Sequence, residues 1–151
     1  MQVADVMTRA SVVESPADSL RAAATLMWKQ QTGSLLVMDG DELLGIVTER
    51  DVMKAVARGS DPDSTPVSAV MTTTLLTVTP DTSLPEAARH MATRWIRHLP
   101  VVAEGKLLGM VSQRDLCGVL AALGSEADLL AIPADELVRS RRVARLAPES
   151  P

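Results

Sequence analysis

The chain has 151 residues, a formal net charge of −4 and a pI near 5.1. Such a chain has no general attraction for nucleic-acid phosphates, so nucleic-acid binding is not expected to be its main role. Hydrophobic residues make up 46%, but Phe and Tyr are absent, so the core is expected to be aliphatic and rich in Met. One Cys excludes an internal disulfide, and no apolar run reaches the roughly 18–20 residues of a membrane span, so we expect a cytoplasmic protein.

The first predicted elements are a short extended piece at Val12-Val13 and a helix. Pro16 and Asp18 indicate the start of the helix. Apolar residues then recur at helical spacing, at Leu20, Ala23, Ala24 and Met27. The pattern predicts one apolar stripe, with Met27 in the core.

Two short apolar runs come next, LLVM (35–38) and LLGIV (43–47), separated by the polar sequence DGDE. Such a pair is typical of a β-hairpin. A second helix is predicted from about Glu49 to Ala57, with Met53 in the core. The unit therefore reads β-α-β-β-α.

The same unit then recurs. Shifting the chain by 64 positions places residues 3–56 over 67–120 without a gap, and about a third of the paired positions are identical. The second copy predicts an extended piece at Leu76–Val78, a helix carrying Leu84, Ala87, Ala88 and Met91, apolar runs at 99–102 and 107–111, and a helix near Gln113–Leu123.

The fold class is therefore α/β (α+β), with two β-α-β-β-α repeats. We assign residues 1–60 to the first repeat, 61–66 to a polar connector and 67–123 to the second. A unit of this size buries too little surface alone, so the copies are expected to share a core about a pseudo-twofold axis.

The repeated sequences GIVTERD (45–51) and GMVSQRD (109–115) lie where a strand ends and a helix begins. Thr48 with Asp51, and Ser112 with Asp115, match a helix capping box, which is typically worth about 1 kcal/mol. A capping box alone explains both pairs.

Other residues of the two sequences favour a binding site. Gly45 and Gly109 would allow something to approach the strand closely. Arg50 and Arg114 place a cation at a helix N-terminus, which already attracts anions. A carboxylate can accept hydrogen bonds from both hydroxyls of a ribose, while hydroxyl, Arg and N–H groups contact phosphate. The duplication favours this second interpretation, a nucleotide site.

The doubled unit, together with DVMT (5–8), AVMT (69–72), HLPVV (98–102) and the two edge sequences, resembles tandem cystathionine-β-synthase (CBS) domains, a pair called a Bateman module. The resemblance covers residues 1 to about 123. It implies a regulatory module that binds an adenosine-containing ligand, AMP, ADP, ATP or S-adenosylmethionine, in two clefts between the repeats. It also implies a homodimer that signals to an effector protein.

In this family each cleft combines residues of both repeats. The resemblance assigns one cleft to Ile46, Thr48, Arg50 and Asp51 with Ser68, Thr73, Ile96, Arg97 and His98. It assigns the other to Met110, Ser112, Arg114 and Asp115 with Ala4, Arg9, Thr32, Gly33 and Ser34.

The two clefts are expected to differ in their affinity for phosphate. Arg97-His98 occupies the position where many relatives carry basic residues, whereas the first repeat has Gly33-Ser34 there. We therefore expect the Asp51 cleft to bind phosphate more tightly. His98 is either a phosphate contact or a structural histidine, and His90 is expected to be structural.

Catalytic and metal-binding motifs are not found in the sequence. We therefore expect a regulatory protein and not an enzyme, with no metal required. Cys117 is expected to be a small buried hydrophobic residue. The alternative function is a ligand-free interaction or scaffold module.

Residues 124–151 lie beyond the repeat and are expected to be a helical tail. Ser125 and Asp128 match another cap, and Pro133 would interrupt the helix. The tail carries a basic cluster, Arg139, Arg141, Arg142 and Arg145. We interpret it as a solvated face, or as a docking segment for a partner protein, for nucleic acid or across a dimer.

Overall fold

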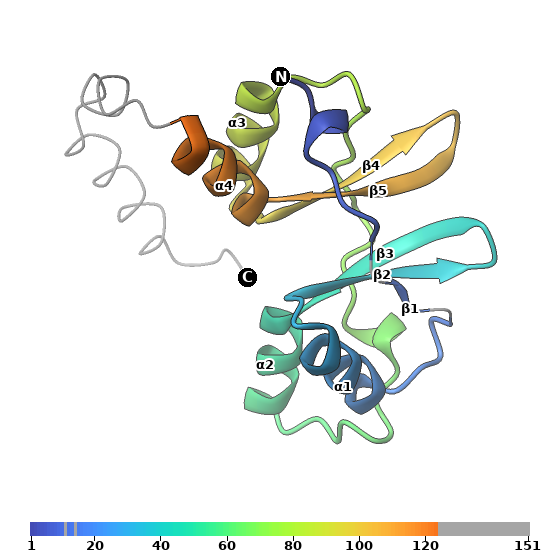
Figure 1. Cartoon of the computed structure of the whole chain (residues 1–151). Helices are drawn as coiled ribbons and strands as arrows, with labels where there is room; N and C mark the ends of the chain where they lie inside the picture. Colours follow the sequence, from blue (N-terminus) through green and yellow to red (C-terminus); the bar gives the residue numbers. More distant parts are fainter. Residues whose placement is uncertain (11, 14, 124–151) are drawn as a thin grey trace. The chain divides into compact units, whose positions relative to one another are not determined.

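The computed structural model describes the chain except for residues 11, 14 and 124–151 (Figure 1). The chain divides into two compact units, Met1–Leu116 and Cys117–Pro151. In the second unit only the end of one helix is described. The expectations for the tail, from Ser125 to the basic cluster, therefore lie outside the described residues.

The first repeat contains the predicted elements in the predicted order. They are strand β1 (Val12–Val13), helix α1 (Leu20–Gln30), strands β2 (Ser34–Asp39) and β3 (Glu42–Thr48), and helix α2 (Glu49–Ala57). A 3-10 turn that was not predicted, η1 (Val3–Asp5), precedes them. The three strands form one sheet in the order β1-β2-β3, with β1 parallel to β2 and β2 antiparallel to β3.

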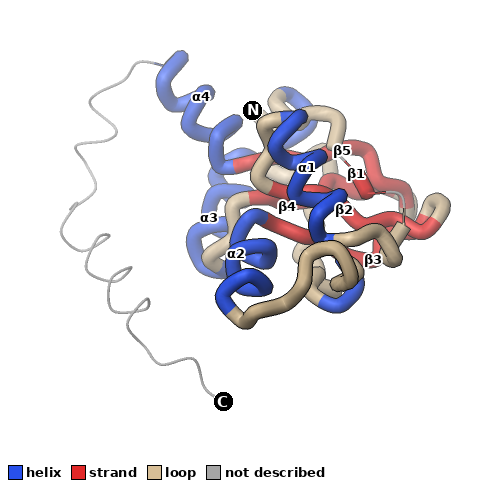
Figure 2. The backbone as a smooth tube through the Cα atoms, turned by 90° about the horizontal axis from the view of Figure 1, so that it is seen from below, coloured by secondary structure: helices blue, strands red, loops and turns tan. Residues whose placement is uncertain are grey.

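The second repeat contains η2 (Val67–Ala69), α3 (Leu84–Arg94), β4 (His98–Ala103), β5 (Lys106–Ser112) and α4 (Gln113–Leu123). Its hairpin pairs His98 with Ser112, just as the first hairpin pairs Ser34 with Thr48. The connector between α2 and η2 contains neither helix nor strand (Figure 2). The mixed fold with two repeated units is thus confirmed.

One predicted strand is wrong. Leu76–Val78 is reduced to a single parallel bridge between Val78 and Val101, so this sheet has two strands. Pro100 stands in β4 where the first repeat has Leu36, the partner of Val12 in β1. A proline has no N–H to donate to a neighbouring strand, which shortens the ladder.

Helix α1 begins at Leu20, shortly after the Pro16 and Asp18 that indicated its start. Its N-cap is Ser19, whose hydroxyl accepts a hydrogen bond from the backbone N–H of Ala22 at 3.1 Å. The carboxylate of Asp18 instead accepts from the backbone N–H of Ser15 in the preceding turn. Ser83 caps α3 in the same way, so the two repeats share this cap.

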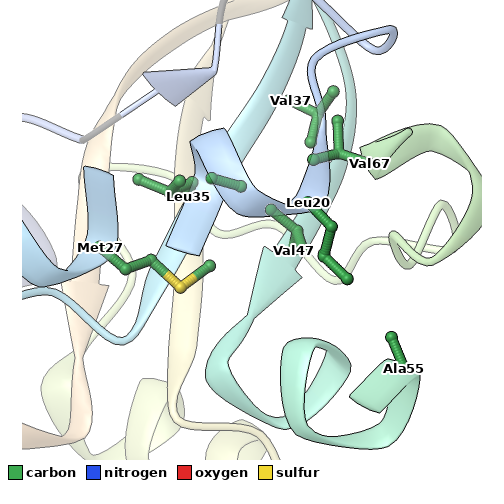
Figure 3. Packing of buried hydrophobic residues seen from close by; sticks show 8 residues of the cluster. Leu20, Met27, Leu35, Val37, Val47, Ala55 and Val67 are labelled. Atoms are coloured by element: carbon green, nitrogen blue, oxygen red, sulfur yellow. The ribbon is translucent and has the colours of Figure 1, made fainter. Parts of the chain in front are cut away.

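Buried aliphatic side chains of the first repeat pack between helices and sheet (Figure 3). The cluster contains Leu20, Ala23, Met27, Leu35, Val37, Val47, Ala55 and Val67. Val67 is fully buried although it belongs to the sequence of the second repeat. The core of the first repeat is therefore completed by the other copy.

The opening segments of the two repeats are exchanged. The backbone N–H of Val3, in η1, donates to Thr82 of the second repeat at 2.8 Å, and that of Val67, in η2, donates to Asp18 of the first at 2.8 Å. Figure 1 accordingly shows η1 beside α3 and η2 beside α1. The exchange makes neither repeat complete on its own, in agreement with the predicted shared core.

Two residues expected in the core are exposed. Met53 is 65% exposed, because α2 turns Ala55 inward and Met53 lies on another side of the helix. Cys117 is also exposed, one position after the buried Leu116. The predictions for Met27 and Met91 are confirmed, since both are 5% exposed.

Candidate functional site

Gly45 and Gly109 allow two crossing segments to approach the hairpins. Each crossing segment, one containing Thr72 and the other Thr8, runs from one repeat to the hairpin of the other. Thr72 forms a two-way backbone bridge with Ile46, and Thr8 forms the matching bridge with Met110, with N···O distances of 2.9–3.0 Å. A Cβ atom on Gly45 would lie 2.8 Å from the Thr72 carbonyl oxygen, and one on Gly109 only 2.5 Å from that of Thr8. The close approach predicted for these glycines is therefore made by the chain itself.

The first edge positions the Asp51 carboxylate. Thr48 ends β3 and caps α2, and both its backbone N–H (2.8 Å) and its hydroxyl (2.9 Å) donate to Oδ2 of Asp51. Both hydrogen bonds from Thr48 go to this same carboxylate oxygen. The cap holds one oxygen of the carboxylate and leaves acceptor capacity on the other.

The second edge repeats this arrangement. The backbone N–H and hydroxyl of Ser112 each donate to Oδ2 of Asp115 at 2.7 Å, and Asp115 N–H donates back to the Ser112 hydroxyl at 3.3 Å. Both pairs are capping boxes or close to one, so the structural interpretation of these residues holds.

A cavity of about 330 Å³ lies at the first edge. Its volume falls at the small end of the range for sites that bind small molecules, roughly 300–1,000 Å³. Seven of the residues assigned to this cleft line it, namely Ile46, Thr48, Arg50, Asp51, Ile96, Arg97 and His98. The structure thus brings the edge of the first repeat and the entrance of β4 in the second around one space.

Two of the assigned residues are not among those that line the cavity. Ser68 lies in η2, where its backbone N–H donates to Pro16 at 3.0 Å. Thr73 lies between two residues that do line it, Thr72 and Thr74.

Six further residues line the cavity and were missed from the sequence. They are Thr72, Thr74, Leu76, Arg94, Trp95 and Pro100. Arg94 and Trp95 directly precede the Ile96-Arg97-His98 run that the motif identified, so extending the run backward would have found them. The position of Thr72 and Thr74 follows from the crossing segment, which no local pattern reveals.

Trp95 has a left-handed backbone, with φ of 56°. It is the C-cap of α3, and its backbone N–H donates to the carbonyl oxygen of Met91. Gln31 holds the same position at the end of α1, with φ of 51°. The repeated left-handed cap turns the chain from each helix toward the strand that follows, and in the second repeat this capping residue, Trp95, is one of the residues that line the cavity.

The cavity is basic. Arg50, Arg94 and Arg97 line it together with His98, against the single carboxylate of Asp51. Burial lowers the pKa of His98 below its ordinary value, and the guanidinium groups of Arg97 and Arg114 lower it too, while Glu49 and Asp115 oppose the shift. His98 is therefore a neutral imidazole near pH 7, and the arginines carry the positive charge.

The residues assigned to the second cleft have more varied positions. Ser34 is buried, and its hydroxyl contacts the sulfur of Met110 at 3.5 Å. Thr32 and Arg114 line a hollow of about 550 Å³, which also includes Trp28 and Glu49. Gly33 accepts a hydrogen bond from the backbone N–H of Glu49 at 3.0 Å.

The N-terminal members of that set lie in or near η1. The backbone N–H of Ala4 donates to Pro80 at 2.8 Å, and Arg9 is exposed one residue after the Thr8 bridge. The first repeat presents a buried hydroxyl, that of Ser34, where the second presents Arg97 and His98.

The described residues hold no group of three or more His, Cys, Asp or Glu side chains that could bind a metal ion. Among the same residues, no helix has the length and apolar character needed to cross a bilayer.

Comparison with known proteins shows the family. The sequence profile of the CBS domain matches residues 3–58 and again residues 67–122. The chain therefore belongs to the CBS domain family, with two CBS domains.

Relatives and solved structures agree. The CBS domain-containing protein YhcV of Bacillus subtilis is 38% identical over 115 residues, which cover 76% of this chain and 81% of that protein. The CBS-domain containing protein ATU1752 of Agrobacterium tumefaciens has a TM-score of 0.75 at 30% identity, covering 80% of this chain and 99% of the other. PAE2072 of Pyrobaculum aerophilum, solved in complex with AMP, has a TM-score of 0.73 at 28% identity, covering 82% and 98%.

Proposed function

We propose that this protein is a regulatory module that binds an adenosine-containing ligand in the Asp51 cavity and signals its presence to a partner protein. The observation that carries the proposal is the composition of the cavity, which is lined by one anchored carboxylate, that of Asp51, and by three arginines drawn from the two repeats. AMP, ADP, ATP and S-adenosylmethionine are the ligands to test.

The chemistry of the cavity supports a ribose with a phosphate. Asp51 is held by Thr48 through Oδ2, so Oδ1 is available to accept from the ribose hydroxyls. Arg50 lies in the first turn of α2, where N–H groups and the helix dipole favour anions. Trp95 offers an aromatic face for a base.

A CBS-domain protein at 28% identity has been solved with AMP, which supports the ligand class. A ligand can shift a conformational equilibrium only by its differential affinity for the two states. Signalling therefore requires a partner that distinguishes the liganded arrangement from the free one, and we propose an effector protein in that role.

Isothermal titration with the four ligands tests the proposal, using wild-type protein and Asp51→Asn. We expect at least one ligand to bind the wild type, and Asp51→Asn to weaken it about tenfold or more, because a charge-assisted pair of hydrogen bonds to the ribose is lost. Asp115→Asn is the matched control, since it removes the equivalent carboxylate of the other repeat. Lack of binding at millimolar ligand would contradict the proposal.

The proposal includes a homodimer. Trp28 on α1 and Met53 and Val56 on α2 are 84%, 65% and 62% exposed, which leaves apolar surface on the helices of the first repeat. Such side chains are costly in water and favour burial against another chain. A second copy of this protein is the partner we propose for them.

The alternative is a ligand-free interaction module. One observation favours it, because both hydroxyl–Asp pairs form helix caps that account for these residues without a ligand. The titrations separate the two functions. A folded protein with no affinity for any of the four ligands would favour the interaction module.

A further inference from the structure

We propose that Glu49 determines the charge selectivity of the Asp51 cavity, because its carboxylate competes with a ligand's phosphate for the guanidinium of Arg97. The inference rests on the proposed function and goes further, since it ranks the ligands by phosphate charge. Glu49 would thereby act as a specificity-determining residue without lining the cavity.

The contact between Glu49 and Arg97 joins the two repeats. Nη2 of Arg97, next to β4, donates to Oε2 of Glu49, at the start of α2, at 3.2 Å. Arg97 lines the cavity, whereas Glu49 is not among the lining residues. Arg97 therefore belongs to the cavity lining and also pairs with a carboxylate that is not part of that lining.

The pair is weak enough for a ligand to disrupt. The side chains of Arg97 and Glu49 are 54% and 60% exposed, and ion pairs in such positions contribute about 0.2–1 kcal/mol. A phosphate, with a higher charge and three acceptor oxygens, can displace the carboxylate. The affinity for that phosphate is then reduced by the cost of breaking the pair and by repulsion from Glu49.

The position of the Glu49 carboxylate depends on Gly33. A Cβ atom at Gly33 would lie 3.0 Å from Oε2 and 3.1 Å from Cδ of Glu49. Gly33 has no positive φ, so its backbone does not itself require glycine. The missing side chain is what gives the carboxylate room to reach Arg97.

The second repeat has no carboxylate at the position of Glu49. The 64-residue offset places Gln113 at the position of Glu49, and Arg97 at the position of Gly33. Gln113 has the same place at the start of α4, where its backbone N–H donates to Arg97 at 2.8 Å, as that of Glu49 donates to Gly33 at 3.0 Å. The chain itself thus shows that glutamine fits this position, which makes Glu49→Gln a conservative test.

The effect should follow ligand charge. Adenosine has no phosphate and should not disturb the Glu49–Arg97 pair. AMP and ADP bring increasing negative charge to the same guanidinium, so removing the carboxylate should favour them. Because the groups are partly exposed, added salt should screen the effect.

The test is isothermal titration of wild type and Glu49→Gln with adenosine, AMP, ADP and S-adenosylmethionine at low and high salt. We expect Glu49→Gln to bind AMP about two- to fivefold more tightly than the wild type does, the range set by an exposed ion pair. The gain in affinity for ADP should be at least as large. Adenosine and the positively charged S-adenosylmethionine should not gain affinity, and the gain for AMP should shrink at high salt.

Three further variants locate the effect. Gly33→Ala should move the flexible Glu49 carboxylate away and shift AMP affinity in the same direction. When Arg97 is already replaced by Gln, adding Glu49→Gln should no longer increase the affinity for AMP. Glu42→Gln, which removes an exposed carboxylate at the other end of β3, should leave every affinity unchanged.

Two results would overturn the inference while leaving the proposed function intact. One is AMP affinity that is equal in wild type and Glu49→Gln, and the other is an equal gain for adenosine and AMP. Lack of binding of these four ligands, and also of ATP, to both proteins would overturn the proposed function and the inference together.

Discussion

At the scale of single residues, His98 connects the cavity with pH. It lines the cavity, and burial lowers its pKa below the ordinary value of 6.5, helped by Arg97 and Arg114 and opposed by Glu49 and Asp115. In the unfolded chain these causes are absent. The unfolded protein therefore binds a proton at a pH where the folded protein does not.

This difference predicts how stability depends on pH. As pH falls from about 6.5 toward the lower pKa of folded His98, the unfolded state takes up a proton that the folded state resists, so the free energy of unfolding decreases. Below that folded pKa, this histidine causes no further loss. Urea unfolding between pH 7.5 and 5.5 should show a smaller decrease for His98→Asn than for the wild type.

The chain contains one other histidine, which supplies the control. His90 lies on α3 with its side chain 38% exposed and Nε2 3.9 Å from a carboxylate oxygen of Glu86. His90→Asn should not reproduce the change seen for His98→Asn. Equal pH dependence of wild type and His98→Asn would refute this account of the buried imidazole.

At the scale of elements, the crossing segments impose the strictest packing requirement. A Cβ atom at Gly109 would meet the backbone oxygen of Thr8 at 2.5 Å, and backbone cannot move aside as a side chain can. We expect Gly109→Ala to lower the free energy of unfolding by about 1–3 kcal/mol, the usual cost of overpacking. Gly45→Ala, with Thr72 oxygen at 2.8 Å, should act in the same direction.

A glycine elsewhere provides the comparison. A Cβ atom at Gly118, inside α4, would meet nothing within 4 Å. Because alanine favours helix over glycine, Gly118→Ala should stabilise by roughly 0.5–1 kcal/mol. Chemical denaturation of the three variants measures these differences, and a Gly109→Ala protein as stable as the wild type would contradict the close-approach argument.

The sequence predicted the elements best where the pattern is local. Two short apolar runs around a polar turn identified both hairpins, and helical spacing identified α1 and α3. Met53 was misplaced because α2 has apolar residues on more than one side, Val52 and Ala55 inward and Met53 and Val56 outward, and periodicity does not say which side meets the core.

The same limit explains the incomplete prediction of the cavity. Edge residues such as Thr48 and Asp51 form a repeated motif, so the sequence reveals them. Thr72 and Thr74 reach the cavity only because a crossing segment pairs with Ile46, a contact between distant parts of the chain. Trp95 reaches it through a left-handed cap, a conformation that its residue type does not signal.

At the scale of the whole molecule, the exchange of opening segments makes the repeats interdependent. Val67 completes the core of the first repeat, with Val70 and Met71 packed against it. Residues 1–60 alone would expose that core, so we expect this fragment not to unfold cooperatively in circular dichroism. Mixing it with residues 61–151 should restore a cooperative transition, and a stable fragment 1–60 would contradict the exchange.

The exposed helical residues lead to a prediction about assembly. If a second copy covers α1 and α2, Met53→Glu places a charge in an apolar interface and should shift the protein from dimer to monomer in sedimentation velocity. Leu108→Glu is the control, because Leu108 is 46% exposed on β5 and the substitution should leave the dimer unchanged. A wild type that is monomeric at about 100 µM, or a Met53→Glu protein that stays dimeric, would exclude this interface.

The same variant tests whether the dimer takes part in signalling. A ligand acts on assembly only through different affinities for the two arrangements. AMP should therefore bind monomeric Met53→Glu and the wild type with different affinities if the dimer takes part in signalling, and with equal affinity if it does not.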